Sequence, residues 1–400
     1  MISVEEAWAF LAQTEVLNGH ETVPLSDAAG RVLSCDVAAQ RTQPPVHVSA
    51  MDGYALRFQD VSQGRTQFDI IGEVPAGKRF DGSLAEGQAV RIFTGAAVPD
   101  GADHIVIQED VTRDGTQMRL TAPQDKPAHI RRAGQDFAGG DILLSAGRVL
   151  TAADLALAAN GNHADLCVTP RPRIAFIASG DELKPAGQAL GEVDIPDSLG
   201  VALAALVSQW GGVPVGHALT PDDPAQFAAA VQALPQADIY VPIGGASVGA
   251  YDFAKQVFAD LGYQMVFSKI AVKPGKPCWF ATTSSSSASS VALGLPGNPA
   301  SAMVTAHLFL RPLIAHLAGR SAALPWAHGR LTAALSANGG RENFLRGEFS
   351  IDDTGQVQLC ASAKQDSALT SVFSAANCLI RRPIEDAARQ PGDVVMILPL

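Results

Sequence analysis

Three loops of the sequence carry residue types that could bind an anion or a metal ion. They read Ser179-Gly180-Asp181-Glu182-Leu183, Gly244-Gly245-Ala246-Ser247-Val248-Gly249 with Asp252 close behind, and Pro296-Gly297-Asn298-Pro299 with Ser301 close behind. Glycines let the backbone approach a ligand closely, and N–H groups at the start of a helix favour negative charge. The loops therefore predict a phosphate or oxyanion site, although each loop alone also fits an ordinary tight turn.

A second group of candidate residues is basic. Lys269, Lys273 and Lys276 lie within the run Lys-Ile-Ala-Val-Lys-Pro-Gly-Lys-Pro. If this run is a strand, Lys269 and Lys273 share a face, because alternate strand residues point the same way. Two ammonium groups could then meet one anion, with the Pro-Gly turn holding them in place. A solvated basic edge is the alternative interpretation.

Carboxylates and lysines around one anion also imply a cation. Asp and Glu would repel a phosphate unless a hard metal ion lay between them, and Mg²⁺ typically binds one or two carboxylates together with substrate phosphates. We therefore expect Glu182 and Asp252 to hold Mg²⁺ or its waters. The five cysteines form no CxxC pair and the nine histidines no HExxH pattern, so the sequence does not indicate zinc.

These loops need strands and helices to position them. Between Ile174 and about Gly319, apolar strand-like runs alternate with helical stretches, which predicts an α/β domain with a mostly parallel sheet. In such sheets, ligands bind beyond the carboxyl ends of the strands. The expected strands are Ile174 to Ala178, Ile239 to Ile243 and Val291 to Leu295, and the expected helices are Gly200 to Trp210, Asp252 to Leu261 and Ala300 to Leu317.

The rest of the chain predicts further domains. Capping signals at Ser3 and Thr151 open two helices, the second ending near Gly161, while short alternating runs from about Val23 to Ile142 and again after His328 indicate β-structure. We expect a multidomain α/β plus β fold, because 400 residues exceed what one core usually organises. The expected parts are a helical or mixed linker domain (1–26 and 140–170), a β-rich insertion domain (27–139), the α/β domain (171–319) and a small C-terminal β-domain (320–400).

The composition of the chain excludes some classes of binding partner. A net charge of -11 argues against a nucleic-acid surface, and the sequence has no uninterrupted apolar stretch of membrane-spanning length. The acidic residues Glu5 and Glu6 stand where a secretory signal would be basic, so we expect a cytoplasmic protein with no membrane partner and with reduced thiols.

Three segments of the β-rich region also stand out. They are Ser49-Ala50-Met51-Asp52-Gly53-Tyr54-Ala55, Phe93-Thr94-Gly95-Ala96 and Arg131-Arg132-Ala133-Gly134-Gln135-Asp136. Turn chemistry alone would explain each of them, as an Asp-Gly turn, a strand end and a basic turn.

Taken in order, these segments resemble the MoeA family, which includes the E domains of gephyrin and of plant molybdenum insertases. The similarity spans essentially the whole chain. Seven motifs carry it: the three β-rich segments, Ser179 to Leu183, Gly244 to Gly249, Lys273-Pro274-Gly275-Lys276-Pro277 and Leu295 to Pro299.

The resemblance implies an elongated homodimer whose α/β domain is similar to molybdopterin adenylyltransferases and faces the partner's β-rich domain. It implies insertion of molybdate into adenylylated molybdopterin with Mg²⁺, release of AMP, and exchange with an adenylyltransferase and with apo-molybdoenzymes. By motif, one subunit would contribute Asp52, Thr94 and Asp136. The other would contribute Glu182, Asp252, Lys269, Lys273, Pro296 and Pro299. The Gly loop, Lys276, Gly297, Asn298 and Ser301 would bind the substrate or its oxyanion.

The sequence departs from the family pattern at a few positions. The segment Pro44-Pro45-Val46-His47-Val48 stands where the family usually has an Asp-Asn pair, Leu199 replaces an Asn, Ile243 replaces a hydroxyl-bearing residue, and Ala250 replaces a common acidic residue. Each change removes a polar group, so a non-catalytic carrier or scaffold that delivers the cofactor is an alternative. A molybdopterin adenylyltransferase is a second alternative.

Overall fold

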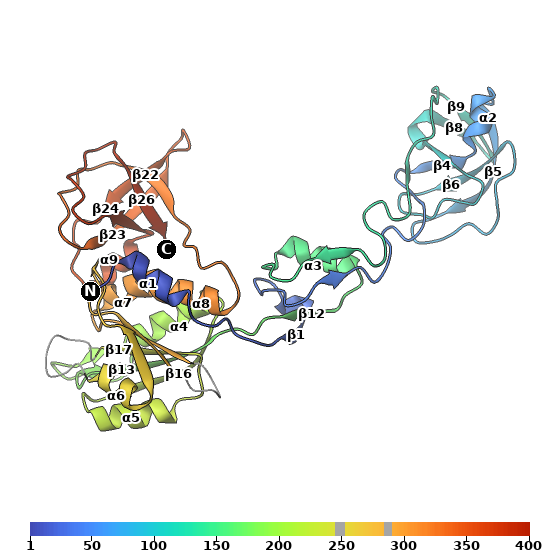
Figure 1. The fold of residues 1–400 in the computed structure, drawn as a ribbon. Helices are drawn as coiled ribbons and strands as arrows, with labels where there is room; N and C mark the ends of the chain where they lie inside the picture. The colour runs from blue at the N-terminus through green and yellow to red at the C-terminus, as the bar shows by residue number, and fades with distance from the viewer. Residues whose placement is uncertain (245–252, 284–289) are drawn as a thin grey trace. The chain divides into compact units, whose positions relative to one another are not determined.

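A computed structural model describes residues 1–244, 253–283 and 290–400. Its contacts divide the chain into two compact units, which are considered separately below (Figure 1). The α/β unit comprises Met1–Glu21, Gly30–Val32 and Thr169–Leu400, and the β-rich unit comprises Thr22–Ala29 and Leu33–Val168.

The β-rich unit is built around a six-stranded sheet in the order β7-β4-β6-β5-β9-β8, in which only the β5–β6 pair is parallel. Residues such as Val90, Ile92 and Ile105 fill one face, and Phe68, Leu56 and Val106 fill the other. The strands of the sheet are β4 (Gly53–Leu56), β5 (Gln67–Val74), β6 (Gln88–Ile92), β7 (His104–Ile107), β8 (Val111–Asp114) and β9 (Gln117–Leu120). The short helices α2 (Phe58–Ser62) and η2 (Gln108–Asp110) connect some of them.

A second, smaller core in this unit gathers around helix α3 (Ala152–Asn160). Thr151 and Asp154 form the capping box expected from the sequence, and the helix stops at Gly161. Ala158 packs with Leu33, Leu144 and Leu166. The neighbouring elements are β1 (Glu21–Pro24), η1 (Leu25–Asp27), β2 (Val37–Ala38), β3 (Val48–Ser49), β10 (Ile130–Arg131), β11 (Ile142–Leu144) and β12 (Asp165–Val168).

The α/β unit contains the mostly parallel sheet predicted from the sequence, in the order β16-β13-β17-β21-β20-β18. The first four strands are parallel, and β20 runs antiparallel to both of its neighbours. Helices α5 and α6 cover one face, and α4, α7 and α8 cover the other (Figure 1). The strands are β13 (Arg173–Ser179), β16 (Val213–Thr220), β17 (Ile239–Ile243), β18 (Tyr263–Phe267), β20 (Trp279–Thr283) and β21 (Val291–Gly294).

The helices of this unit agree with the sequence prediction in kind, but α5 was not expected. They are α1 (Val4–Leu11), α4 (Leu199–Gln209), α5 (Pro224–Ala233), α6 (Ala254–Asp260), α7 (Pro299–Thr305), the π-helical turn η3 (Ala306–Leu310) and α8 (Arg311–Leu317). The short strands β14 (Leu183–Lys184) and β15 (Ile195–Pro196) pair with each other. Helix α1 begins with the predicted Ser3–Glu6 capping box and buries Val4, Ala7 and Leu11 in the main core.

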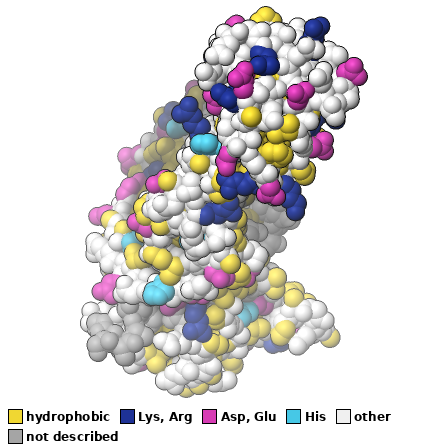
Figure 2. All heavy atoms as spheres, turned by 90° about the vertical axis from the view of Figure 1, so that its right-hand side faces the viewer, with side chains coloured by type: hydrophobic (Ala, Val, Ile, Leu, Met, Phe, Trp, Pro, Cys, Tyr) yellow, Lys and Arg dark blue, Asp and Glu magenta, His cyan; other side chains and the backbone are white. Residues whose placement is uncertain are grey.

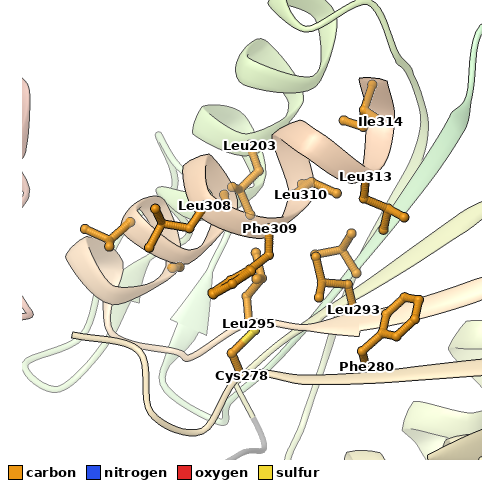
Figure 3. Close-up of a cluster of buried hydrophobic side chains, with 14 of the residues drawn as sticks. Leu203, Cys278, Phe280, Leu293, Leu295, Leu308, Phe309, Leu310, Leu313 and Ile314 are labelled. Atoms are coloured by element: carbon orange, nitrogen blue, oxygen red, sulfur yellow. The ribbon is translucent and has the colours of Figure 1, made fainter. Parts of the chain in front are cut away.

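The continuous helical stretch Pro299–Leu317 forms the centre of the α/β core. Its mean hydropathy of 1.2 and its length would suit a membrane span, but 78% of the stretch is buried within the protein. Phe309 and Leu313 point toward Leu295 and Leu293, and Leu308 belongs to the same buried cluster (Figure 3). Burying each such side chain stabilises the fold by about 1.5–3 kcal/mol, so this stretch acts as a core helix.

The C-terminal residues form a small closed sheet. Strands β23, β24, β22, β26 and β25 pair in that order, and β25 pairs back to β23, which closes the ring as a barrel. Closure removes the exposed edges of a sheet. The elements are β22 (Ala327–Leu331), β23 (Glu342–Ile351), β24 (Val357–Ala361), α9 (Thr370–Ala375), β25 (Cys378–Arg382) and β26 (Val394–Pro399), and the two-residue strand β19 (Val272–Lys273) joins β23 in parallel from outside the ring.

Candidate functional site

The loops at the carboxyl ends of the parallel strands meet, as the sequence predicted. The Gly244 N–H donates to the Leu295 carbonyl at 3.2 Å, and the Gly180 N–H donates to the Thr220 carbonyl at 3.1 Å. A Cβ atom on Gly297 would lie 3.3 Å from the Gly244 Cα. The backbones after β17 and β21 therefore come close together because both positions lack a side chain.

Three carboxylates gather at the ends of β13 and β16. Asp181 accepts a hydrogen bond from the Asp222 N–H at 3.3 Å, and Asp222 has both Asp181 and Glu182 as electrostatic neighbours. Burial raises the pKa of the Asp222 carboxyl above its usual value, and the two neighbouring carboxylates add to that increase. Such a group favours a bound cation, because a cation relieves the repulsion among the three acids.

The lysine segment differs from the expected continuous strand. Lys269 follows the end of β18, and only Val272 and Lys273 form β19. Ile2 pairs with Ile270 within the run, since its N–H donates to the Lys269 carbonyl and its carbonyl accepts from the Ala271 N–H. The run from Lys269 to Lys273 therefore does not form the single strand on which a shared face of the two lysines depended.

A tight turn connects Lys273 to Lys276. Gly275 at its centre has a φ of 117°, which disfavours other residues, and a Cβ there would lie 2.3 Å from the Thr305 Cγ2 of α7. The turn thus fits against the core helix only with glycine at this position. Both lysine side chains are exposed.

The C-terminal residues contribute two polar groups beside these loops that the sequence did not reveal. Arg341 donates to the Val272 carbonyl at 3.4 Å, next to Lys273 in β19. The Ser367 hydroxyl accepts from the Asn298 amide at 3.0 Å, and the Ser367 carbonyl accepts from the Ala300 N–H at 2.9 Å. Part of the helix start at Pro299 is therefore already hydrogen-bonded within the protein, and Ser301 behind it is buried.

In the β-rich unit, Asp52 and Thr94 form a hydrogen-bonded pair. One Asp52 carboxylate oxygen accepts from the Thr94 N–H at 2.7 Å and from the Thr94 hydroxyl at 2.8 Å. These hydrogen bonds lower the pKa of the Asp52 carboxyl, because they stabilise its charged form. Thr94 is exposed and Asp52 is half-buried, so the pair presents a fixed negative charge at the surface.

Asp136 lies in the wall of a cleft of about 780 Å³ that Gly95, the neighbour of Thr94, also lines. The His47 imidazole accepts a hydrogen bond from the Ala133 N–H at 2.9 Å, which ties down the turn before Asp136. His47 lies in the segment where the family pattern has an Asp-Asn pair. Its imidazole Nδ1 can accept this bond as a carboxylate oxygen would, so the turn has a side-chain acceptor.

The remaining predicted residues Gly245, Ser247, Gly249 and Asp252, and the departure at Ala250, lie outside the described residues. Within residues 1–244, 253–283 and 290–400, no group of three or more His, Cys, Asp and Glu side chains is arranged to hold a metal ion by itself. The departures at Leu199 and Ile243 are buried in the main core.

Asp222, Arg341 and Ser367 are the residues that sequence reasoning missed. Asp222 could have been found, because it follows a strand end as Glu182 does, but Pro214 and Gly216 obscured strand β16. Arg341 and Ser367 approach the site only through the packing of the C-terminal residues, and no local pattern in the sequence marks them.

Comparisons with known proteins cover the whole chain. Residues 2–161 match the MoeA N-terminal region (domain I and II), residues 175–316 match a probable molybdopterin binding domain, and residues 328–400 match the MoeA C-terminal region (domain IV). A solved molybdopterin biosynthesis moeA protein from Pyrococcus horikoshii has the same fold, with a TM-score of 0.82, 24% identity and full coverage of both chains.

Curated relatives agree. A molybdopterin molybdenumtransferase of Haemophilus influenzae is 35% identical over 98% of this chain and 96% of its own length. A molybdopterin molybdenumtransferase 2 of Mycobacterium tuberculosis is 36% identical over 86% of this chain and 87% of its own length. With similarity of this extent along the full sequence, the chain belongs to the MoeA family of molybdopterin molybdenumtransferases.

Proposed function

We propose that the protein is the enzyme that inserts molybdate into adenylylated molybdopterin, forming molybdenum cofactor and releasing AMP. The observation that carries the proposal is the arrangement around α7 of the α/β unit. Its start contacts Ser367, its Thr305 packs on the Lys273–Lys276 turn, and the preceding Gly297 lies against Gly244. Glycine backbones and lysines are the groups that bind phosphate and other oxyanions.

The oxyanion would bind at the lysine turn. Lys273 and Lys276 supply positive charge, and Arg341, just before β23, donates to the Val272 carbonyl and has a guanidinium suited to an oxyanion. The Gly244 loop and the Pro296–Pro299 segment would lie against the bound substrate, and Lys269 would add charge nearby. Catalysis then rests on positioning and on neutralising the negative charges that meet.

Mg²⁺ would bind at the carboxylate group. Glu182 and Asp222 both offer oxygen ligands. Burial and the nearby charges of Glu182 and Asp181 raise the pKa of the Asp222 carboxyl, and Asp252 follows the Gly loop in sequence. Mg²⁺ commonly keeps waters and substrate phosphates as its other ligands, so two carboxylates are a sufficient protein contribution. When bound, the ion would offset phosphate charge.

Asp52, Thr94 and Asp136 would act from the β-rich unit. The Thr94 hydrogen bonds fix the orientation of the Asp52 carboxylate, so it can accept a hydrogen bond or bind a metal-bound water without first reorganising. We further propose a cytoplasmic homodimer that receives its pterin from an adenylyltransferase and passes the product to apo-molybdoenzymes. Light scattering of the purified chain tests the dimer.

The deciding experiment mixes the purified protein with adenylylated molybdopterin, Mg²⁺ and molybdate. AMP is followed by chromatography, and active cofactor is followed by reconstitution of an apo-molybdoenzyme. Molybdate-dependent AMP release together with cofactor formation is the expected result. Omitting molybdate provides the control.

A carrier is the second candidate, because the buried apolar side chains of Leu199 and Ile243 offer no hydrogen bond to a ligand. Tight binding of the pterin without AMP release would identify a carrier. Consumption of ATP by the protein with molybdopterin alone would instead identify an adenylyltransferase.

A further inference from the structure

The cleft of about 780 Å³ lies entirely within the β-rich unit and is the starting point for a second binding site. Its volume falls in the range of about 300–1,000 Å³ that is usual for small-molecule sites. The walls come from four separate stretches, residues 41–48, 77–79, 95–97 and 131–136. Of these residues, the sequence prediction assigned a role only to Asp136.

Hydrogen bonds fix the walls to one another. The Gly134 N–H donates to the Pro44 carbonyl at 3.0 Å, and the Ala97 N–H donates to the Lys78 carbonyl at 3.3 Å. The His47 side chain adds its bond to the Ala133 N–H. The cleft is therefore largely preformed, which lowers the entropy cost of binding a ligand there.

Positive charge dominates the lining. Arg41, Lys78, Arg79 and Arg131 face one acid, Asp136, although the whole chain has a net charge of -11. In the part of the chain that the structure describes, the side chains of Arg41, Lys78 and Arg131 form no hydrogen bond or ion pair. Arg79 has only a distant exposed partner, Asp100 at 3.8 Å. Figure 2 shows Lys and Arg side chains, with Asp and Glu among them, on the face that it presents.

The same cleft has an apolar part. Pro44, Pro45, Val46 and Val48 line it beside the basic residues. Pro and Val side chains pack against the face of a flat ring, whereas unpaired guanidinium and ammonium groups bind phosphate. A ligand that carries both a ring and a phosphate would satisfy both parts of the cleft.

We infer that this cleft binds the phosphate-bearing part of a phosphorylated ring compound. On the proposed function, which this inference deepens, that compound is the pterin nucleotide, and Arg41, Lys78 and Arg131 hold its phosphates. Val48 contributes apolar lining within the segment where the family pattern has an Asp-Asn pair.

Calorimetric titration of the full-length protein with inorganic pyrophosphate tests the cleft without any turnover. Arg41→Gln/Arg131→Gln is the test variant, since both side chains are exposed and unpaired and their loss should leave the fold intact. Arg119→Gln/Lys126→Gln is the matched control, because it removes the same charge from exposed positions of the same unit outside the cleft. The test variant should bind pyrophosphate at least about tenfold more weakly, the size expected for losing charge-assisted hydrogen bonds, and the control should bind as wild type.

Undetectable binding to wild type, or equal weakening in the test and control variants, would overturn the inference. The insertion assay adds a second readout, in which the test variant should raise the KM for adenylylated molybdopterin and leave the KM for molybdate unchanged. A rise confined to molybdate would instead place the oxyanion in the cleft and overturn the phosphate assignment. If wild type releases no AMP yet the pyrophosphate result holds, the proposed function fails and the cleft assignment stands.

Discussion

In the β-rich unit, the Asp52 carboxylate accepts two hydrogen bonds from Thr94, and its pKa is lowered. In the α/β unit, Asp222 is half-buried beside Asp181 and Glu182, and its pKa is raised. The first carboxylate is stabilised in its charged form by the protein itself. The second is destabilised in its charged form by burial and by the two neighbouring carboxylates, which a bound cation would offset. The contrast suggests that the β-rich unit orients ligands, whereas the α/β unit collects opposite charges around them.

The largest expected effect tests whether the α/β unit captures the oxyanion. Lys273→Ala should lower insertion at low molybdate by about 10- to 100-fold, since a hydrogen bond to a charged group is worth about 1.5–3 kcal/mol. Initial rates over a molybdate series measure it. Lys126→Ala, which removes an exposed lysine of the β-rich unit, is the control. Full activity of Lys273→Ala at low molybdate would contradict the assignment.

Gly275→Ala should come next, through stability. The positive φ and the contact with Thr305 together should cost about 2–4 kcal/mol, from backbone strain and overpacking. Urea unfolding measures the loss. Adding Thr305→Ser removes the Cγ2 atom that a Cβ would meet, so the double variant should recover part of the stability if the clash matters. No recovery would mean that the backbone conformation alone requires glycine.

Asp222→Asn should have a smaller, pH-dependent effect. Because the folded pKa is raised, the favourable contribution of the neutral group is present below the unfolded pKa of about 3.9 and is lost as pH rises through the folded pKa. The permanently neutral variant should therefore be more stable than wild type at pH 7, on the order of 0.5 kcal/mol after solvent screening, but not at pH 3.

Mg²⁺ sharpens this test. The ion should raise the Tm of wild type more than that of Asp222→Asn or Glu182→Gln, because the variants have less repulsion for it to relieve. Ca²⁺ and Na⁺ at equal ionic strength control for charge screening. Equal Tm shifts in all three proteins would remove these carboxylates from the Mg²⁺ site.

Thr94→Val should have the smallest effect. It removes the hydroxyl hydrogen bond but keeps the N–H bond, so the pKa of Asp52 should rise toward its ordinary value without reaching it. The stabilisation from a lowered folded pKa is present above the unfolded pKa and is lost as pH falls through the folded one, so the two proteins should differ near neutral pH and converge in acid. Carboxyl NMR titration measures the pKa. An unchanged Asp52 titration would show that the hydroxyl bond is unimportant.

Local signals made much of the α/β fold predictable from sequence. The Ser3 and Thr151 capping boxes marked α1 and α3, and the apolar run 239–243 matched β17 at both ends. Strand β16 escaped because Pro214, Gly216 and His217 interrupt its apolar pattern. Helix α5, which follows this strand, was not predicted either, although Asp223 caps its start.

The candidate site was harder to predict where it depends on contacts distant in sequence. Lys269 lies outside a continuous strand, and Ile2, at the other end of the sequence, hydrogen-bonds on both sides of Ile270. Arg341 and Ser367 reach the lysine turn and Asn298 through the C-terminal residues, which periodicity cannot anticipate. The motifs therefore predicted where the loops lie. Contacts between residues distant in sequence determine which other side chains lie beside them.

The parallel pairing of β19 with β23 bears on how this protein can be divided or recombined. Val272 and Lys273 belong by sequence to the α/β region, yet their register is set by Glu342 and Asn343 of the C-terminal barrel. The three family segments are consequently not interchangeable parts. A chimera that grafts a relative's C-terminal region onto this chain would also change the strand pairing that positions the lysine turn. On the proposed function, such a graft should change oxyanion affinity even though every lysine came from the recipient.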